Sequence, residues 1–277
     1  MVTLLSILHE RKVITALVAL GLILLEYLFH KLNHDDAYDV RETATSLFIA
    51  LGNKIIGYLT VGIVAVPMLF IHRHRLFTVP LDSAWAWFAL FLGVEFSYYV
   101  HHVAMHRVAW FWASHAVHHS PTRLNLSAAV RLGWGGNISG GFLFYLPLIA
   151  LGFHPLAVVA MLGLGLLYQF LLHVAHAPSL GPLEWVLNTP RHHRVHHASN
   201  AACLDKNFGA MLIVFDRLFG TFARAPKDEV LRFGVIGAQP SANPLRVVFG
   251  VWLKVIADAR QARGLGATMR ALFGAPH

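Results

Sequence analysis

Three short groups of histidines are the feature of this chain best suited to chemistry. The groups are His102 and His106; His115, His118 and His119; and His193, His196 and His197. Neutral imidazole is the commonest metal ligand in proteins. Residues three and four positions apart share one face of a helix, so each group can direct two or three ring nitrogens toward one point. One such group would be weak support, whereas three in a single chain predict a polyhistidine metal centre.

The first group continues a polar stripe that begins at Glu95. Glu95, Tyr98, His102 and His106 occupy positions i, i+3, i+7 and i+11, which lie on one helical face. A carboxylate near a ligating histidine can orient that histidine or bind the metal itself. A buried acid at the end of an apolar run is costly without a partner, so Glu95 is predicted to serve the site as a catalytic residue; capping, or pairing with an arginine, is the alternative. His101 lies roughly 100° from this stripe and is not expected to be a ligand.

Two further histidines, His173 and His176, end an apolar run and lie three residues apart. Either could complete a ligand set if the fold brings it near the three groups. His192 precedes the third group and would face away from it on a helix. We therefore expect His192, like His101, to lie outside the ligand set.

The number of histidines exceeds the need of one zinc ion, because zinc is usually satisfied by four ligands. Two metal ions are therefore predicted. Imidazole sites suit zinc, copper, iron and nickel. The sequence has no nucleophile elbow, phosphate-binding loop or dinucleotide-binding motif. At a membrane, redox-active iron that handles oxygen is the most economical assignment.

The composition indicates a membrane protein. Hydrophobic residues make up 56% of the 277-residue chain, charged residues only 13%, and the mean hydropathy is +0.56, whereas a soluble domain is about one-quarter charged. With this hydropathy, the net charge of +8 suits a surface of anionic lipid better than a nucleic acid, which we do not expect as a partner. The single cysteine, Cys203, excludes an intrachain disulfide and a cysteine-based zinc or iron–sulfur site.

Five apolar runs are candidates for membrane helices. They are residues 13–29, 55–71, 84–100, 138–153 and 156–172. His154-Pro155 separates the last two runs and is a natural turn, so these two are expected to form a hairpin. The sequence thus predicts an all-α, integral membrane protein with four or five membrane helices and a cytosolic helical cap that carries the polyhistidine di-metal site.

The histidines constrain the arrangement of these runs. The third run leads into the first histidine group and the fifth ends at His173, so both must end on one side of the membrane. Fifteen of the 22 lysines and arginines lie from Arg107 onward, which fits a cytoplasmic face. We expect a single membrane domain over residues 1–277, a catalytic region over 82–224 and an amphipathic tail over 225–277. Within this tail, residues 243–260 have helical periodicity and should lie on the membrane or pack on the cap.

Longer segments around the histidines resemble a known family. The segments are Glu95-Phe-Ser-Tyr-Tyr-Val-His-His-Val-Ala-Met-His106, Trp112-Ala-Ser-His-Ala-Val-His-His-Ser120, Asn188-Thr-Pro-Arg-His-His-Arg-Val-His-His197, Asp205-Lys-Asn-Phe-Gly209 and Phe215-Asp-Arg-Leu-Phe-Gly-Thr221. Together they resemble the fatty acid hydroxylase (sterol desaturase) superfamily over roughly residues 82–224, nearest to its alkylglycerol monooxygenase-like and sterol C5-desaturase-like branches. Two positions depart from the pattern: Val103 replaces an arginine of the first box, and Arg107 replaces an acid typical of the alkylglycerol monooxygenase-like branch.

The resemblance implies that the eight histidines of the three groups ligate two iron ions at the cytosolic ends of membrane helices, with His173 as a further ligand. It also implies that four polar residues fix the loops beside the site: Asn125, Asn200, Asp205 and Asn207. The implied activity is that of an O2-dependent oxidoreductase that hydroxylates, or alternatively desaturates, a lipid. Electrons would come from an external donor, a ferredoxin or a cytochrome b5-like protein. The arginine- and alanine-rich composition favours a bacterial inner membrane as the location.

Two other classes of protein remain as alternatives. A non-enzymatic membrane haem or metal carrier would place its histidines within the spans, on separate helices. The histidines here gather instead at the ends of the apolar runs and beyond them. A zinc hydrolase would need about three ligands and an acid, which leaves most of these histidines unexplained.

Overall fold

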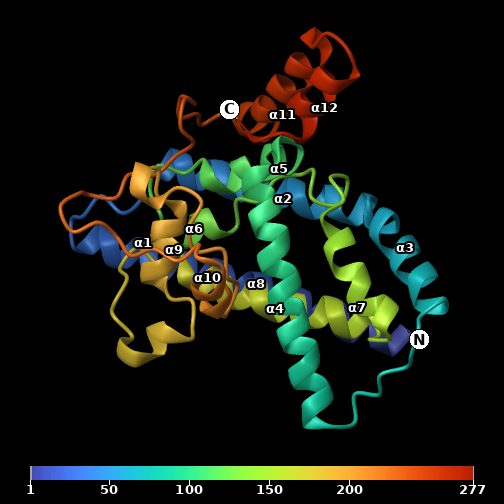
Figure 1. Ribbon diagram of the computed structural model, residues 1–277. Helices are drawn as coiled ribbons and strands as arrows, with labels where there is room; N and C mark the ends of the chain where they lie inside the picture. Colours follow the sequence, from blue (N-terminus) through green and yellow to red (C-terminus); the bar gives the residue numbers. More distant parts are fainter. Residues whose placement is uncertain (1, 277) are drawn as a thin grey trace.

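The structure is a computed structural model that describes the backbone of residues 2–276 and the side chains of residues 13–276. Over these residues the chain forms α-helices and short 3-10 helices, joined by loops, and no strand (Figure 1). Two isolated β-bridges, Leu187 with Leu212 and Ala198 with Phe233, connect loops of the cap. The prediction of an all-α fold is confirmed for the described residues.

The first three helices are α1 (Val2–Leu32), α2 (Val40–Leu59) and α3 (Val61–Arg73). Asp39 begins α2 as an N-cap, because its side chain accepts a hydrogen bond from the backbone N–H of Glu42 at 2.8 Å. The apolar run over residues 55–71 does not form one straight helix, since α2 and α3 meet at Thr60 with a bend of 47°.

The helix that leads to the first histidine group is α4 (Ala84–Arg107), which is followed after Val108 by α5 (Ala109–His119). The Ser83 hydroxyl caps α4 by accepting a hydrogen bond from the N–H of Ala86 at 3.3 Å. The extended backbone of Val108 separates the two helices, and α4 and α5 pack against each other. A short helix, α6 (Leu126–Ala129), follows.

The fourth apolar run forms a 3-10 helix, η1 (Gly141–Tyr145), and a short helix, α7 (Leu146–Leu151). It does not form the long helix that the sequence predicts. Gly140 has a φ of +89°, which interrupts the helix before η1, and Pro147 lies in the first turn of α7, where it lacks the N–H that a longer helix would use. The chain then reverses at Gly152 (φ +118°) and continues in α8 (Pro155–Leu172), so the predicted turn forms.

Two helical segments are long and apolar enough to cross a membrane, Val13–Leu32 and Pro155–Leu172, and a third is added if the bent pair α2–α3 counts as one span. Most of their large apolar side chains are exposed, as lipid contact requires. The 11-residue stretch Gly141–Leu151 is apolar but shorter than a span. The number of four or five spans therefore stays a prediction.

The cap contains η2 (Gly181–Trp185), α9 (Pro190–His197), η3 (Ala201–Cys203) and α10 (Val214–Phe219). Helix α9 packs against the end of α8. The last helices are α11 (Pro244–Gln261) and α12 (Leu265–Phe273), which lie beside α5 (Figure 1). Val255 of α11 is buried against Ala109 and Ala113 of α5. Part of the apolar stripe of the tail thus packs on α5, which carries the second histidine group, while Leu245, Phe249 and Leu253 of α11 stay exposed.

Candidate metal centre

The structure gathers nine histidines into two adjacent groups at the ends of α4 and α8. We call the first five the A group: His102, His106, His115, His119 and His196. The other four are the B group: His118, His173, His193 and His197. Within each group, one nitrogen of every ring lies within 4.8 Å of one nitrogen of every other ring, and all nine residues are buried. These are the nine histidines that the sequence proposes as ligands.

The division into the A group and the B group differs from the division into three histidine groups along the sequence. On α5, His115 and His119 belong to the A group while His118, between them, belongs to the B group. On α9, His196 belongs to the A group and its neighbour His197 to the B group. Residues four apart share a helical face and neighbouring residues diverge by about 100°, so one helix end can serve two adjacent centres.

The ring nitrogens of each group approach one another closely. In the A group, the Nε2 atom of His115 lies 3.0 Å from that of His102 and 3.1 Å from that of His119. In the B group, the Nε2 atom of His173 lies 3.2 Å from that of His118 and 3.1 Å from that of His193. Imidazole nitrogens are thus packed together in two small, buried volumes.

Backbone carbonyls orient three of these rings. The Nδ1 atom of His102 lies 2.8 Å from the carbonyl oxygen of Phe208. The Nδ1 atom of His173 lies 2.8 Å from the carbonyl oxygen of Gln169, and that of His196 lies 2.9 Å from the carbonyl oxygen of Lys206. A carbonyl oxygen only accepts hydrogen bonds, so Nδ1 carries the proton in each neutral ring and Nε2 presents a lone pair to the group. A carbonyl or carboxylate on the distal nitrogen is the usual support of a metal-ligating histidine.

The arrangement fits bound cations. Three rings, those of His102, His173 and His196, direct a proton outward to a carbonyl oxygen and a lone pair inward. The buried Nε2 atoms of His106 and His196 have no hydrogen-bond partner among the described residues. Burial first, and the neighbouring histidines next, lower the pKa of His119, His196 and His197 well below its usual value. The rings are therefore neutral at pH 7, which is the form that binds a metal.

A loop that follows α9 supplies two of the supporting carbonyls, and Asp216 holds that loop in place. The buried carboxylate accepts hydrogen bonds from the N–H of Phe208 at 2.7 Å, from the N–H of Gly209 at 2.8 Å and from the Thr221 hydroxyl at 2.7 Å. The sequence alone does not indicate a role for Asp216. The only signal was its place in the segment Phe215–Thr221 that resembles the family.

The four polar residues predicted to fix loops take part in such contacts. Asn207 donates to the carbonyl oxygens of His192 and Ala223, at 3.0 and 2.9 Å. Asp205 Oδ1 lies 3.5 Å from Nδ1 of His106 in the A group. Of the other two, Asn125 caps α6 and donates to the Ala37 carbonyl oxygen at 2.8 Å. Asn200 donates to a carboxylate oxygen of Glu229 at 2.7 Å.

Comparison with known proteins agrees with this site. The family described as fatty acid hydroxylase matches residues 87–221, a range that includes all nine histidines. The chain is 42% identical to the human alkylglycerol monooxygenase over 184 residues, and 38% identical to the zebrafish alkylglycerol monooxygenase over 218 residues. The chain belongs to the fatty acid hydroxylase superfamily.

These matches cover most of the chain but less than half of each monooxygenase. The human match covers 65% of this chain and 40% of the relative, and the zebrafish match covers 78% and 48%. An ornithine lipid hydroxylase of Rhizobium tropici is 32% identical over 184 residues, which is 65% of this chain and 54% of the relative. No solved structure matches this member of the superfamily.

Glu95 of this fatty acid hydroxylase homologue lies outside both histidine groups among the described residues. Its buried Oε2 atom accepts hydrogen bonds from the N–H groups of Met211 and Leu212, at 2.9 and 2.8 Å. It therefore ties α4 to the loop that follows α9. On the same stripe of α4, the Tyr98 hydroxyl donates to the side-chain oxygen of Gln169 at 2.6 Å, and the Gln169 carbonyl oxygen is the one that orients His173.

The remaining candidate histidines of this superfamily member lie apart from the two groups. The His101 ring stacks on Phe144 with a centroid distance of 5.0 Å. His192 is buried with its ring 5.3 Å from Phe222. His176 is exposed at the end of the fifth apolar run. Of the two histidines that end this run, the fold therefore brings His173 to the others and leaves His176 outside.

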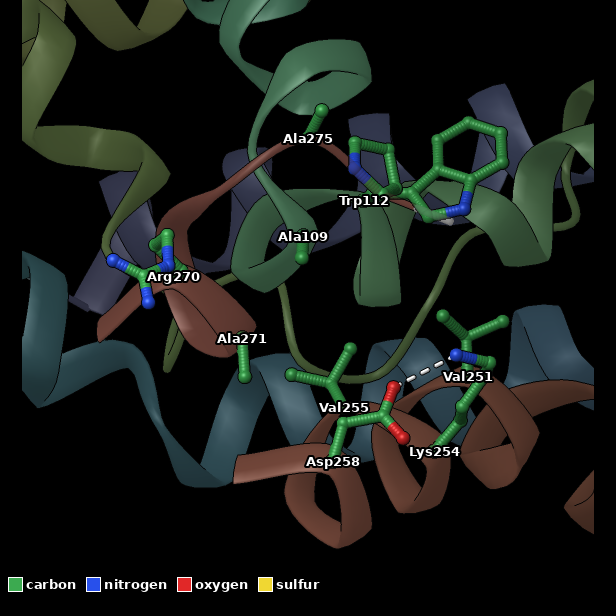
Figure 2. A pocket seen from close by; sticks show the side chains of 10 residues that line it. Ala109, Trp112, Val251, Lys254, Val255, Asp258, Arg270, Ala271 and Ala275 are labelled. Atoms are coloured by element: carbon green, nitrogen blue, oxygen red, sulfur yellow. Dashed lines mark hydrogen bonds and ion pairs between the residues drawn. The ribbon is translucent and has the colours of Figure 1, made fainter. Parts of the chain in front are cut away.

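Trp112 lies between the A group and a cavity on the protein surface. Its ring centroid lies 5.3 Å from that of His106 and 5.6 Å from that of His119. Trp112 also lines a cavity of about 320 Å³ between α5, α11 and α12, which Figure 2 shows together with the ion pair of Lys254 and Asp258. Within this homologue, the indole is thus the wall between that cavity and two rings of the site.

Proposed function

We propose that this chain is a membrane-bound di-iron monooxygenase that hydroxylates a lipid, with O2 as oxidant and an external electron donor. The observation that carries this proposal is the pair of buried, all-histidine groups with lone pairs directed inward. The names of the relatives, alkylglycerol monooxygenase and ornithine lipid hydroxylase, support a lipid substrate and favour hydroxylation over desaturation.

In this proposal, the A group holds one iron ion and the B group holds the other. When bound, the iron pair supplies the redox chemistry that uses O2 to oxidise an unactivated C–H bond. One oxygen atom enters the product and the other leaves as water, so each turnover consumes two electrons and two protons. A ferredoxin or a cytochrome b5-like protein would supply the electrons.

The chain's own residues would prepare the site. The carbonyls of Phe208, Gln169 and Lys206 would hold their histidines with Nε2 toward the metal. Asp216 would keep two of these carbonyls in position through the loop that it binds. Trp112 would limit the access of water to the A group from the surface cavity. Glu95 is proposed to act on the site through the loop at Met211 and Leu212.

The location in the cell follows from the same reasoning and is part of the proposal. The histidine groups lie at the ends of α4 and α8, and 15 of the 22 lysines and arginines lie from Arg107 onward. A bacterial inner membrane with the site on its cytoplasmic face fits this distribution of charge. Labelling of single cysteines placed at the exposed residues His176 and Leu76, in intact cells and in lysed cells, would test the orientation.

Two measurements test the proposed function. Metal analysis of the purified chain should find two irons per chain, and a His119→Ala, His197→Ala double variant should bind little iron. His176→Ala is the matched control, because His176 is exposed and outside both groups. Mass spectrometry of lipids from cells with and without the gene should show a lipid that gains one oxygen atom. Haem, or a single zinc with no iron, would exclude the proposal, and a loss of two hydrogen atoms would indicate a desaturase.

A further inference from the structure

A second cavity, of about 580 Å³, lies between η2 and α9 and is separate from the histidine groups. Arg191, His192, Arg194 and Val195 of α9 line it. These positions lie on the side of α9 opposite to the histidines that enter the two groups, given about 100° per residue. The cavity is therefore a different site from the metal centre, built on the other face of the same helix.

The cavity is strongly basic. Three guanidinium groups line it, those of Arg191, Arg194 and Arg224, against the one carboxylate of Glu184. Oε1 of Glu184 accepts hydrogen bonds from the Ser179 hydroxyl at 3.1 Å and from the Leu180 N–H at 3.0 Å. None of the three arginines forms an ion pair with a described residue. The excess of positive charge calls for an anionic occupant.

The arginines keep most of their donors available. Arg194 donates through Nη1 to the Ala175 carbonyl oxygen at 2.9 Å, and Arg191 donates through Nε to the Ala177 carbonyl oxygen at 3.4 Å. Each guanidinium has five N–H donors in a planar fork that matches phosphate oxygens. The remaining donors can therefore bind an anion without breaking the contacts that fix the two side chains.

His192 forms a buried part of the wall between Arg191 and Arg194. Its side chain is only 4% exposed, and its ring packs edge-on against Phe222. The charge of the wall therefore comes from the three arginines and Glu184.

The cavity lies at the level where α8 would leave the membrane. The Tyr168 hydroxyl, one turn before the end of α8, donates to the carbonyl oxygen of Asn188 at 2.6 Å. The segment after η2 is thus beside the last turn of a candidate span. On η2 itself, Leu183 is 56% exposed and Trp185 is 63% exposed. Tryptophan next to exposed apolar residues and arginines is typical of a membrane–water interface.

We propose that this cavity binds the phosphate headgroup of an anionic membrane lipid, with the apolar surface of η2 facing the acyl region of the bilayer. The arginines would bind the phosphate oxygens and the exposed Leu183 and Trp185 would contact the chains. The site would hold this lipid at the edge of the cap. This proposal goes beyond the hydroxylase function and needs neither a metal nor turnover.

The test is lipid retention by the full chain, purified in detergent and measured by native mass spectrometry. Phosphatidylglycerol should remain bound more strongly than phosphatidylcholine. An Arg191→Gln, Arg224→Gln double variant should lose affinity for phosphatidylglycerol on the order of tenfold or more. The matched control is Arg246→Gln with Arg260→Gln, since both residues are exposed on α11, outside the cavity.

A variant that should bind the lipid more strongly keeps the proposal testable even if the arginine variants fail to fold. Glu184→Gln removes the opposing charge and keeps an acceptor for Ser179, so it should strengthen retention of phosphatidylglycerol by a few-fold. Equal losses in the cavity and control variants would overturn the proposal. If glycerol phosphate binds as tightly as the lipid, the ligand is a free phosphate compound. If the cavity variants lose binding only to an acidic electron-transfer protein, the partner is a protein. Either result would overturn the lipid assignment. Iron content should not change in any of these variants.

Discussion

His102 donates its Nδ1 proton to the carbonyl oxygen of Phe208 across 2.8 Å, which joins α4 to a loop 106 residues later in the chain. The same loop orients His196 through Lys206 and is held by Asp216. The direction of two ring nitrogens of the A group is therefore decided by a carboxylate that never touches a histidine of that group.

Asp216→Ala should weaken metal binding about 10- to 100-fold, because supporting residues of metal ligands have effects of this size. It should also destabilise the protein by about 1–3 kcal/mol, since two buried N–H groups lose their acceptor. Metal titration and thermal unfolding in detergent would measure the two effects. Asp258→Asn, in an exposed pair with Lys254 on α11, is the control and should change neither. Full metal affinity in Asp216→Ala would show that the loop does not support the histidines.

Glu95→Gln should keep the full metal content, because Glu95 binds backbone N–H groups and belongs to neither histidine group. Glu95→Leu should lower stability by about 1–3 kcal/mol, since Met211 and Leu212 would keep unpaired buried donors. Metal analysis and thermal unfolding of both variants would separate a structural role from a catalytic one. If Glu95→Gln retains metal and stability but loses activity, the carboxylate itself takes part in the reaction.

His119→Ala and His197→Ala should each remove about one metal ion per chain, since each variant depletes a different group. Two ions need two sets of about four ligands. The B group stays complete in His119→Ala, and the A group stays complete in His197→Ala. Metal analysis of the saturated variants is the measurement, with His176→Ala as the unaffected control. Loss of both ions in both variants, with the fold intact, would argue for one shared centre.

Acid should destabilise the protein and release its metal over a defined range of pH. Burial lowers the pKa of His173 to about 4, while the unfolded chain has a value near 6.5. Between these values the unfolded state binds more protons, so stability is full above about pH 6.5 and falls as the pH drops toward 4. Unfolding midpoints from pH 8 to pH 4, with and without metal, would check this. His173→Leu should show a shallower dependence, and a midpoint that rises on acidification would contradict the explanation.

The eight histidines of the three groups could be chosen from the sequence because their spacing reflects helical geometry within a single element, whereas only the family resemblance favoured His173 over His176. Their division into two groups could not, since it depends on how α5 and α9 rotate against α4 and α8. Asp216 and the carbonyls of Phe208 and Lys206 were also beyond prediction, because backbone acceptors leave no residue signature. The fourth apolar run was wrongly predicted as a long helix, since hydropathy alone does not register the break at Gly140.

Helices α5 and α9 each contribute to both the A group and the B group. An ion bound in one group would fix the rotation of both helices and so place the remaining ligands of the other group before its own ion arrives. The second ion would then lose less conformational entropy on binding than the first. Metal uptake by this protein should therefore be cooperative, with the second ion bound more tightly than the first.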